Sequence, residues 1–127
     1  TGLGIPPAQI APFVVQRVGL TQARRLALTG MRLDGQEAQR VGLVHQSCKD
    51  AAALEDALAA TLEAIRRCAP GANAATKEIM FASLVTPLPE VLDRAADLFA
   101  ACLRGPEGRE GVRAFLEKRS PAWARKI

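Results

Sequence analysis

The side chains that could do chemistry are few, and they form no known catalytic pattern. His45 is the one histidine of the chain, and Cys48, Cys68 and Cys102 are its cysteines. A histidine with no nucleophile or second ligand nearby is usually structural. Three widely spaced cysteines without a CxxC pair indicate neither a disulfide framework nor a zinc site. We therefore predict no metal site in this segment and assign His45 no catalytic role.

The charged residues are typical of solvated helix faces. Seventeen Lys and Arg against thirteen Asp and Glu give a net charge of +4, and the basic residues are spread along the whole chain. A nucleic-acid binder usually gathers its positive charge and places aromatic residues within it. With four Phe, one Trp and no Tyr, this chain offers little for base stacking. Nucleic acid is therefore the least favoured partner, whereas a small phosphorylated ligand is compatible with the charge.

The composition predicts a packed, soluble protein. Apolar residues make up 49% of the chain and charged residues 24%, which is typical of globular domains. No apolar run approaches the ~20 residues of a membrane span, and the N-terminus lacks the pattern of a signal peptide. Unpaired cysteines suit a reducing compartment. We expect a cytoplasmic location and no membrane partner.

The first fifty residues are predicted to be a loop, three short helices and one strand. Two glycines and two prolines within Thr1–Pro7 favour an irregular opening. Apolar residues at helical spacing follow, and they are interrupted at Gly19, Gly30 and Gly42, each a suitable helix end. The apolar start of Leu43–Cys48 makes it the one credible strand, although a single strand finds no partner inside this chain.

The rest of the chain is predicted to be helical. Apolar spacing and Pro/Gly breaks predict helices near residues 52–68, 74–84 and 89–103, and a last short helix that starts at Gly105-Pro106 and is stopped by Ser120-Pro121. Pro70-Gly71 is expected to end the first of these, and Pro89 to stand in the first turn of the third. The apolar stripe of that third helix is unusually broad, which indicates burial on more than one side.

Five separated segments resemble, in order, the enoyl-CoA hydratase/isomerase (crotonase) family. They are the loop Gly2-Leu3-Gly4-Ile5-Pro6-Pro7, the stretch from Arg17-Val18-Gly19 to Leu28-Thr29-Gly30, Glu37-Ala38 with Gly42-Leu43-Val44, Lys77, and the closing Glu110-Gly111-Val112-Arg113-Ala114-Phe115-Leu116-Glu117-Lys118-Arg119 with Pro121 and Trp123. Each match alone is short, but together they cover nearly the whole chain.

The resemblance implies an α/β fold of the crotonase type, a spiral of ββα turns, of which this segment is the mostly α-helical C-terminal part. Residues 1–50 would be the end of the spiral core, with its loop, short helices and strand. Residues 51–127 would be a helical oligomerisation region that builds a homotrimer or a dimer of trimers.

The resemblance also implies an acyl-CoA substrate and no separate cofactor, since coenzyme A is carried by the substrate. In the family, two backbone N–H groups hold the thioester carbonyl and two glutamates handle the added water. Placing Gly4 on the family's loop glycine puts the second glutamate just before Thr1, so no catalytic side chain falls in this segment. The backbone of Ala8 corresponds to the amide that helps hold the reacting water, or it merely continues the loop.

Four side chains are candidates for substrate binding by this resemblance. Gln9 and Ile10 could line the acyl pocket, although Ile10 equally suits a core position. Phe115 and Lys118 are three residues apart and are predicted to share a helix face. The resemblance places that face against a neighbouring subunit's coenzyme A, with Phe115 at the adenine and Lys118 at a phosphate. The alternative is a packing role for Phe115 and a solvated Lys118.

The loop Ala8–Val15 departs from the glycine-rich form common in the family and is similar to that of hydratases acting on branched dicarboxylic acyl-CoA thioesters, such as methylglutaconyl-CoA and isohexenylglutaconyl-CoA hydratases. The function that the resemblance implies is water addition to a 2-enoyl-CoA, and the loop points to a substrate of this glutaconyl type. Two alternatives stay open: another activity of the family such as enoyl-CoA isomerisation, and a helical assembly module without catalysis.

Overall fold

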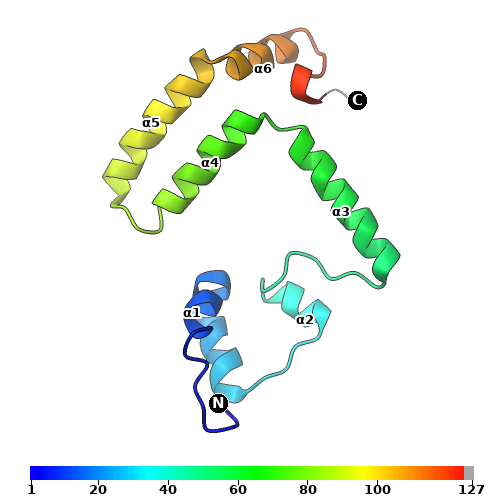
Figure 1. The fold of residues 1–127 in the computed structure, drawn as a ribbon, viewed down its shortest axis with the longest axis vertical. Coiled ribbons are helices and arrows are strands. Elements are labelled where there is room, and N and C mark those ends of the chain that lie inside the picture. The colour runs from blue at the N-terminus through cyan, green and yellow to red at the C-terminus, as the bar shows by residue number, and fades with distance from the viewer. Residues whose placement is uncertain (125–127) are drawn as a thin grey trace. The chain divides into compact units, whose positions relative to one another are not determined.

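The computed structural model describes residues 1–124, which form helices joined by loops and turns (Figure 1). The helices are α1 (Ala11–Thr29), α2 (Gly35–Arg40), α3 (Ala51–Arg66), α4 (Pro70–Ala82), α5 (Leu88–Arg104), α6 (Pro106–Leu116) and the short 3-10 turn η1 (Ala122–Ala124). The chain forms two compact units, unit 1 from residue 1 to 58 and unit 2 from residue 59 onward, so their boundary falls inside α3. The last three residues of the predicted region 51–127 lie outside the described residues.

The helix α1 is interrupted at the glycine that was predicted to end it. Gly19 has φ 74° and ψ 162°, which breaks the helical path, and Gly30 has φ 63° directly after the last helical residue. Left-handed and mirror-β conformations of this kind suit glycine because it lacks a Cβ. The two short helices predicted here are therefore confirmed, although they follow each other closely enough to form one element.

The helix α2 has a side-chain cap at its start and ends at the glycine that the sequence predicts. Asp34 Oδ1 accepts a hydrogen bond of 2.8 Å from the Glu37 N–H, which satisfies one of the free amides of the first turn. At the other end Gly42 has φ 80°, and the Leu43 N–H donates to Ala38 O at 2.9 Å. This pair of features closes the helix in the manner that a C-terminal glycine allows.

The segment after α2 does not form the strand predicted for residues 43–48. Leu43 O accepts from Arg17 Nε at 3.1 Å, and the Ser47 N–H donates to Gln39 Oε1 at 2.6 Å. The backbone groups of a strand need a neighbouring strand as partner, and the described residues contain none. Side chains of α1 and α2 satisfy these backbone groups instead, so the prediction of a strand was wrong.

Unit 2 contains an antiparallel pair of helices, α4 and α5, followed by α6 (Figure 1). Pro70 begins α4, where the sequence had predicted that it ends the preceding helix. Proline fits the first helical position because its missing N–H would have no partner there. The Glu107 carboxylate of α6 accepts from the Gly71 N–H at 2.9 and 3.2 Å, so α6 caps the start of α4 with a negative charge.

Little of the apolar surface is buried. Within residues 1–124 the buried apolar side chains are Ala23, Ala38, Val91 and Ala114, all of small or moderate size. Helix α5 shows why its apolar stripe is so broad: Val91 is buried, whereas Leu92, Phe99 and Leu103 are 59%, 68% and 50% exposed. Monomeric proteins seldom expose apolar patches of this extent, so these helices carry a second apolar side that unit 2 itself does not cover.

Candidate functional site

The loop before α1 contains three of the predicted site residues. Ala8, Gln9 and Ile10 are all exposed, and the turn is held by the backbone. The Ala8 N–H donates to Pro6 O at 2.8 Å and the Ile10 N–H to Pro7 O at 3.1 Å. The Ala8 amide is thus at the surface but already has an acceptor, and it must release Pro6 O before it can hold a water molecule well.

An apolar groove of about 540 Å³ lies in unit 1. Ile10 lines it, whereas Ala8 and Gln9 are not among its lining residues. The other residues around it are apolar except for Arg24: Pro7, Ala11, Val14, Val15, Leu20, Ala23, Leu26, Ala27, Leu28, Met31, Leu33 and Leu43. A groove of this size and character suits an acyl chain or packed protein side chains, which are the two roles predicted for Ile10.

At the other end of the chain, Phe115 and Lys118 do not share a helix face. Helix α6 ends at Leu116, and Lys118 has φ 51°, the left-handed region that is unusual for a residue with a Cβ. The Lys118 N–H donates to Phe115 O at 3.2 Å, and the next N–H along the chain donates to Ala114 O at 3.0 Å. The predicted helical spacing was wrong because the chain reverses direction at Lys118, a position that helices usually give to glycine.

Both candidate side chains are nevertheless open to solvent. Phe115 is 83% exposed at the end of α6, and Lys118 is also exposed. No residue in the described part of the chain forms a hydrogen bond or an ion pair with the Lys118 ammonium. An exposed aromatic ring can stack on a planar ring, and an exposed ammonium can bind an anion, which is compatible with the predicted contacts to a nucleotide.

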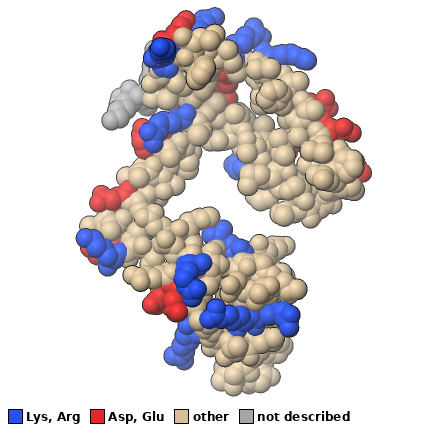
Figure 2. Space-filling view, turned by 180° about the vertical axis from the view of Figure 1, so that it is seen from behind, with Lys and Arg blue, Asp and Glu red and all other residues tan. Residues whose placement is uncertain are grey.

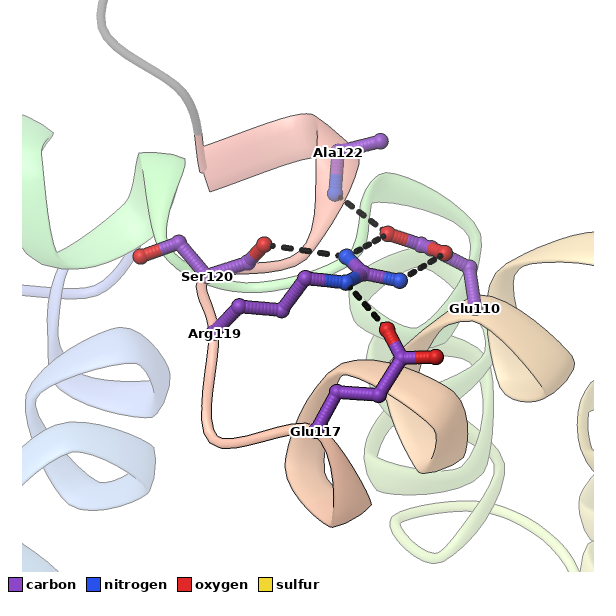
Figure 3. Close-up of polar contacts among 5 residues, drawn as sticks. All are labelled: Glu110, Glu117, Arg119, Ser120 and Ala122. Carbon is purple, nitrogen blue, oxygen red and sulfur yellow. Dashed lines mark hydrogen bonds and ion pairs between the residues drawn. The ribbon is translucent and has the colours of Figure 1, made fainter.

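A cluster of charged groups surrounds this chain reversal (Figure 3). The Arg119 guanidinium donates to both oxygens of Glu110, at 2.7 and 3.0 Å, and its Nε donates to Glu117 Oε2 at 2.6 Å. The Glu110 carboxylate also accepts from the Ala122 N–H at 2.9 Å, and Ser120 O accepts from Arg119 at 3.2 Å. We name these five residues the C-terminal clasp. Two parallel N–H···O bonds fix the Arg119 plane as a single bond cannot.

The clasp shifts the pKa of both its main partners. The hydrogen bonds from Arg119 hold the pKa of the Glu110 carboxyl at about 2, below its ordinary 4.5, and the Ala122 N–H contributes in the same direction. The same pairing raises the pKa of Arg119. The two side chains are partly exposed, at 24% and 31%, so salt weakens their attraction.

The sequence did not single out Glu110 and Arg119 as a pair. They are nine residues apart, and Arg119 lies beyond the helix on which Glu110 stands. Helical periodicity relates residues three or four apart, so it gives no signal for a contact across a chain reversal. Their proximity depends on the left-handed backbone of Lys118, which residue type alone does not reveal.

Trp123 ties the clasp to the end of α3. Its indole Nε1 donates to Arg67 O at 3.2 Å, and a Cβ added at Gly111 would lie 3.2 Å from the indole ring. The small residue on α6 thus lets the indole pack close to the helix. Helices α3 and α6 are therefore connected through the residue that follows the clasp.

Other types of site find no support in the described part of the chain. His45 is exposed in the bend after α2. Residues 1–124 contain no group of His, Cys, Asp and Glu suited to a metal ion. No helix among them is both long and apolar enough to cross a bilayer. Lys and Arg side chains form several separate groups, with wide uncharged areas between them (Figure 2).

Comparison with known proteins identifies the fold. A structure of AtuE from Pseudomonas aeruginosa is 60% identical and superposes with a TM-score of 0.91, over 98% of this chain and 48% of that one. An enoyl-CoA hydratase/isomerase from Marinobacter aquaeolei is 52% identical, with a TM-score of 0.88 over 98% of this chain and 47% of that one. The chain has the crotonase fold, of which it forms the helical C-terminal part.

Sequence comparison agrees with the structural one. A putative enoyl-CoA hydratase of Thermus thermophilus is 34% identical over 119 residues, which are 94% of this chain and 47% of that protein. The chain thus spans about half the length of the curated relatives that it matches. The family model described as enoyl-CoA hydratase/isomerase matches residues 1–126. The chain belongs to the enoyl-CoA hydratase/isomerase family.

Proposed function

We propose that this chain is the C-terminal half of an enoyl-CoA hydratase that adds water across the double bond of a 2-enoyl-CoA thioester. The observation that carries the proposal is the family match over residues 1–126, supported by an exposed loop at Ala8–Ile10 beside an apolar groove. By the family resemblance the catalytic glutamates would belong to the preceding half, so we expect this chain by itself to be inactive.

We further propose a branched dicarboxylic acyl group of the glutaconyl type as substrate. The support is the loop Ala8–Val15, which resembles that of hydratases for such thioesters. Ile10 lines the groove, and Gln9 stands exposed beside it. The substrate class is tested with the complete protein by comparing kcat/KM for a methylglutaconyl-type thioester and for crotonyl-CoA. A higher value for crotonyl-CoA would refute it.

Hydration and isomerisation are the two activities that the family name includes, and one assay separates them. A hydratase consumes the conjugated 2-enoyl thioester, so the absorbance of the conjugated group falls. An isomerase given a 3-enoyl thioester produces that conjugated group, so the absorbance rises. We expect loss of absorbance with the 2-enoyl substrate and no rise with the 3-enoyl one.

We propose that the Ala8 N–H holds the reacting water when substrate is bound. Ala8→Pro removes this donor and is expected to lower kcat about ten- to hundredfold, because a positioned backbone donor near the reacting atoms contributes on that scale. Ala8→Gly keeps the N–H and is the matched control. Circular dichroism of both variants checks that they fold. Equal kcat values for the two variants would contradict the role.

For coenzyme A, we propose contacts from Phe115 to the adenine and from Lys118 to a phosphate, reaching a neighbouring subunit of a homotrimer or a dimer of trimers. Exposure of both side chains supports this. Lys118→Ala should raise KM for the acyl-CoA and leave kcat largely unchanged, since the proposed contact is with the nucleotide of coenzyme A and not with the acyl group that reacts. An unchanged KM would rule out the phosphate contact.

The second candidate function is a helical assembly module without catalysis. The exposed apolar side of α5 favours it, because such a surface suits contact with another chain. A complete protein that assembles but shows no turnover with either thioester would favour this alternative over the enzyme.

A further inference from the structure

The backbone at Lys118 is held in a conformation that needs support from its surroundings. A residue with a Cβ persists at φ 51° only where neighbouring interactions fix it. The two hydrogen bonds that close α6, from the N–H groups of Lys118 and Arg119, are part of that support. These two bonds do not fix the path of the chain after Lys118, which depends on the groups that bind the Arg119 side chain.

The Arg119 side chain fixes the path of the chain after Lys118 through contacts with residues before and after the reversal. Its guanidinium binds Glu110 on α6 with two hydrogen bonds and Glu117 just after the helix with a third. Glu110 in turn accepts from the Ala122 N–H beyond the reversal, as Figure 3 shows. The chain between Glu117 and Ala122 is therefore attached to α6 at both ends, with Lys118 inside the closed segment.

The Lys118 ammonium is exposed, and among residues 1–124 it has no hydrogen-bond or ion-pair partner, so it takes no part in this network. A network that only closed the helix could do so with glycine at position 118, because glycine adopts positive φ without steric cost. Here a long cationic side chain stands at that position instead, and the clasp fixes the backbone from which it projects. The clasp therefore fixes the direction in which the Lys118 side chain leaves the backbone.

We propose that Glu110 and Arg119 are positioning residues that orient Lys118 toward the nucleotide part of an acyl-CoA substrate. The inference rests on the proposed coenzyme A contact of Lys118. It adds that the affinity for the nucleotide depends on the clasp, although neither Glu110 nor Arg119 touches the ligand. A phosphate is bound by Lys118 as a point charge, so displacement of the ammonium weakens binding directly.

The test compares two substrates with the same acyl group in the complete protein. One is the acyl-CoA, and the other is the N-acetylcysteamine thioester, which lacks the nucleotide. We expect Arg119→Ala to raise KM for the acyl-CoA about three- to tenfold, with kcat unchanged. Kinetics with the N-acetylcysteamine thioester should not change. A purely structural role would lower the active fraction and affect both substrates alike, and that result would overturn the proposal.

Three further variants make the test specific. Arg109→Ala is the matched control, because this exposed arginine of α6 donates to Arg104 O at 2.8 Å and should affect neither substrate. Added to Lys118→Ala, Arg119→Ala should cause no further rise in KM, since it acts through Lys118. Arg119→Lys keeps the charge without the two-pronged contact and should show part of the effect. It replaces Arg119→Ala if that variant folds poorly.

The outcomes separate the inference from the proposed function. If Lys118→Ala leaves KM unchanged, the coenzyme A contact itself is wrong. If Lys118→Ala raises KM but Arg119→Ala and Arg119→Lys do not, the contact stands and the positioning role is wrong. Additive effects in the double variant would also contradict the positioning role, because Arg119 would then act independently of Lys118.

Discussion

Gly108 lies in the first turn of α6, close to the last turn of α5, and its missing side chain makes that approach possible. A Cβ at this position would collide with Cys102 O and would lie 2.8 Å from Leu103 O. These are backbone atoms and cannot rotate away as a side chain can. At the scale of single residues, the packing in unit 2 therefore depends on one absent methyl group.

Gly108→Ala is accordingly expected to destabilise the fold by about 1–3 kcal/mol, the usual cost of forcing an extra group into a filled space. The free energy of unfolding measured in urea gives the value. Gly2→Ala is the control, because a Cβ there would meet no atom within 4 Å. Equal stability of the two variants would show that the α5–α6 junction can move apart.

The second prediction at this scale concerns the Glu110 carboxyl and the dependence of stability on pH. Its pKa is about 2 in the folded chain, below its ordinary 4.5. The folded state therefore favours the ionised form, and the stabilisation is complete above pH 4.5 and is lost as the pH falls toward 2. We expect Tm to fall over this range, and to fall less in Glu110→Gln, which has no proton to gain. Parallel Tm curves for the two proteins would contradict this assignment.

At the scale of elements, the ends of the helices show what the sequence can predict. Gly30 and Gly42 lie at helix ends as expected, because glycine readily adopts the left-handed backbone found there. Pro70 was assigned to the wrong helix, since proline suits both the residue after a helix and the first turn of the next. Local chemistry predicts that an end exists, but it does not always say to which helix it belongs.

The candidate site could be predicted from the sequence only in part. The family's motifs drew attention to Phe115 and Lys118, and both are exposed as ligand contacts must be. Their relative placement was predicted wrongly, because a left-handed lysine has no signature in the sequence. The contact of Glu110 with Arg119 follows from that reversal, so it could not be predicted either. The predicted strand at residues 43–48 failed because a strand needs a neighbouring strand as partner, and residues 1–124 contain none.

The end of α6 gives the prediction that belongs to this scale. Lys118→Gly removes the steric cost of the left-handed conformation and is expected to stabilise the fold by about 0.5–1 kcal/mol. The same change removes the ammonium, so affinity for acyl-CoA should fall while Tm rises. Lys118→Ala is the matched control, because it removes the charge and keeps the backbone cost. A Tm for Lys118→Gly no higher than that of Lys118→Ala would count against the argument.

At the scale of the whole molecule, the dominant feature is apolar surface that neither unit covers. On α5, Leu88, Leu92, Phe99 and Leu103 share one exposed face, which adjoins the side that buries Val91. A side of this kind is expected to be buried in the assembled protein. The division predicted at residue 50 is not tested by the two compact units, whose boundary lies within α3.

We expect the exposed face of α5 to lie in the contact between subunits. Leu92→Asp combined with Phe99→Asp should therefore reduce the complete protein from its proposed trimer to a smaller species, because a buried unpaired charge is costly. Light scattering coupled to size-exclusion chromatography gives the mass. Asp97→Asn on the opposite face of α5 is the control. An unchanged mass in the double variant would place the contact elsewhere.

The position of Trp123 has a spectroscopic consequence. It is the one tryptophan of the chain, which has no tyrosine. The fluorescence of this chain under near-ultraviolet excitation therefore comes from a single indole ring. That ring packs near Gly111 and donates to Arg67 O directly beyond the clasp. Its emission maximum would move to longer wavelength whenever the clasp opened to water, giving this chain a built-in optical reporter of whether Lys118 is held in place.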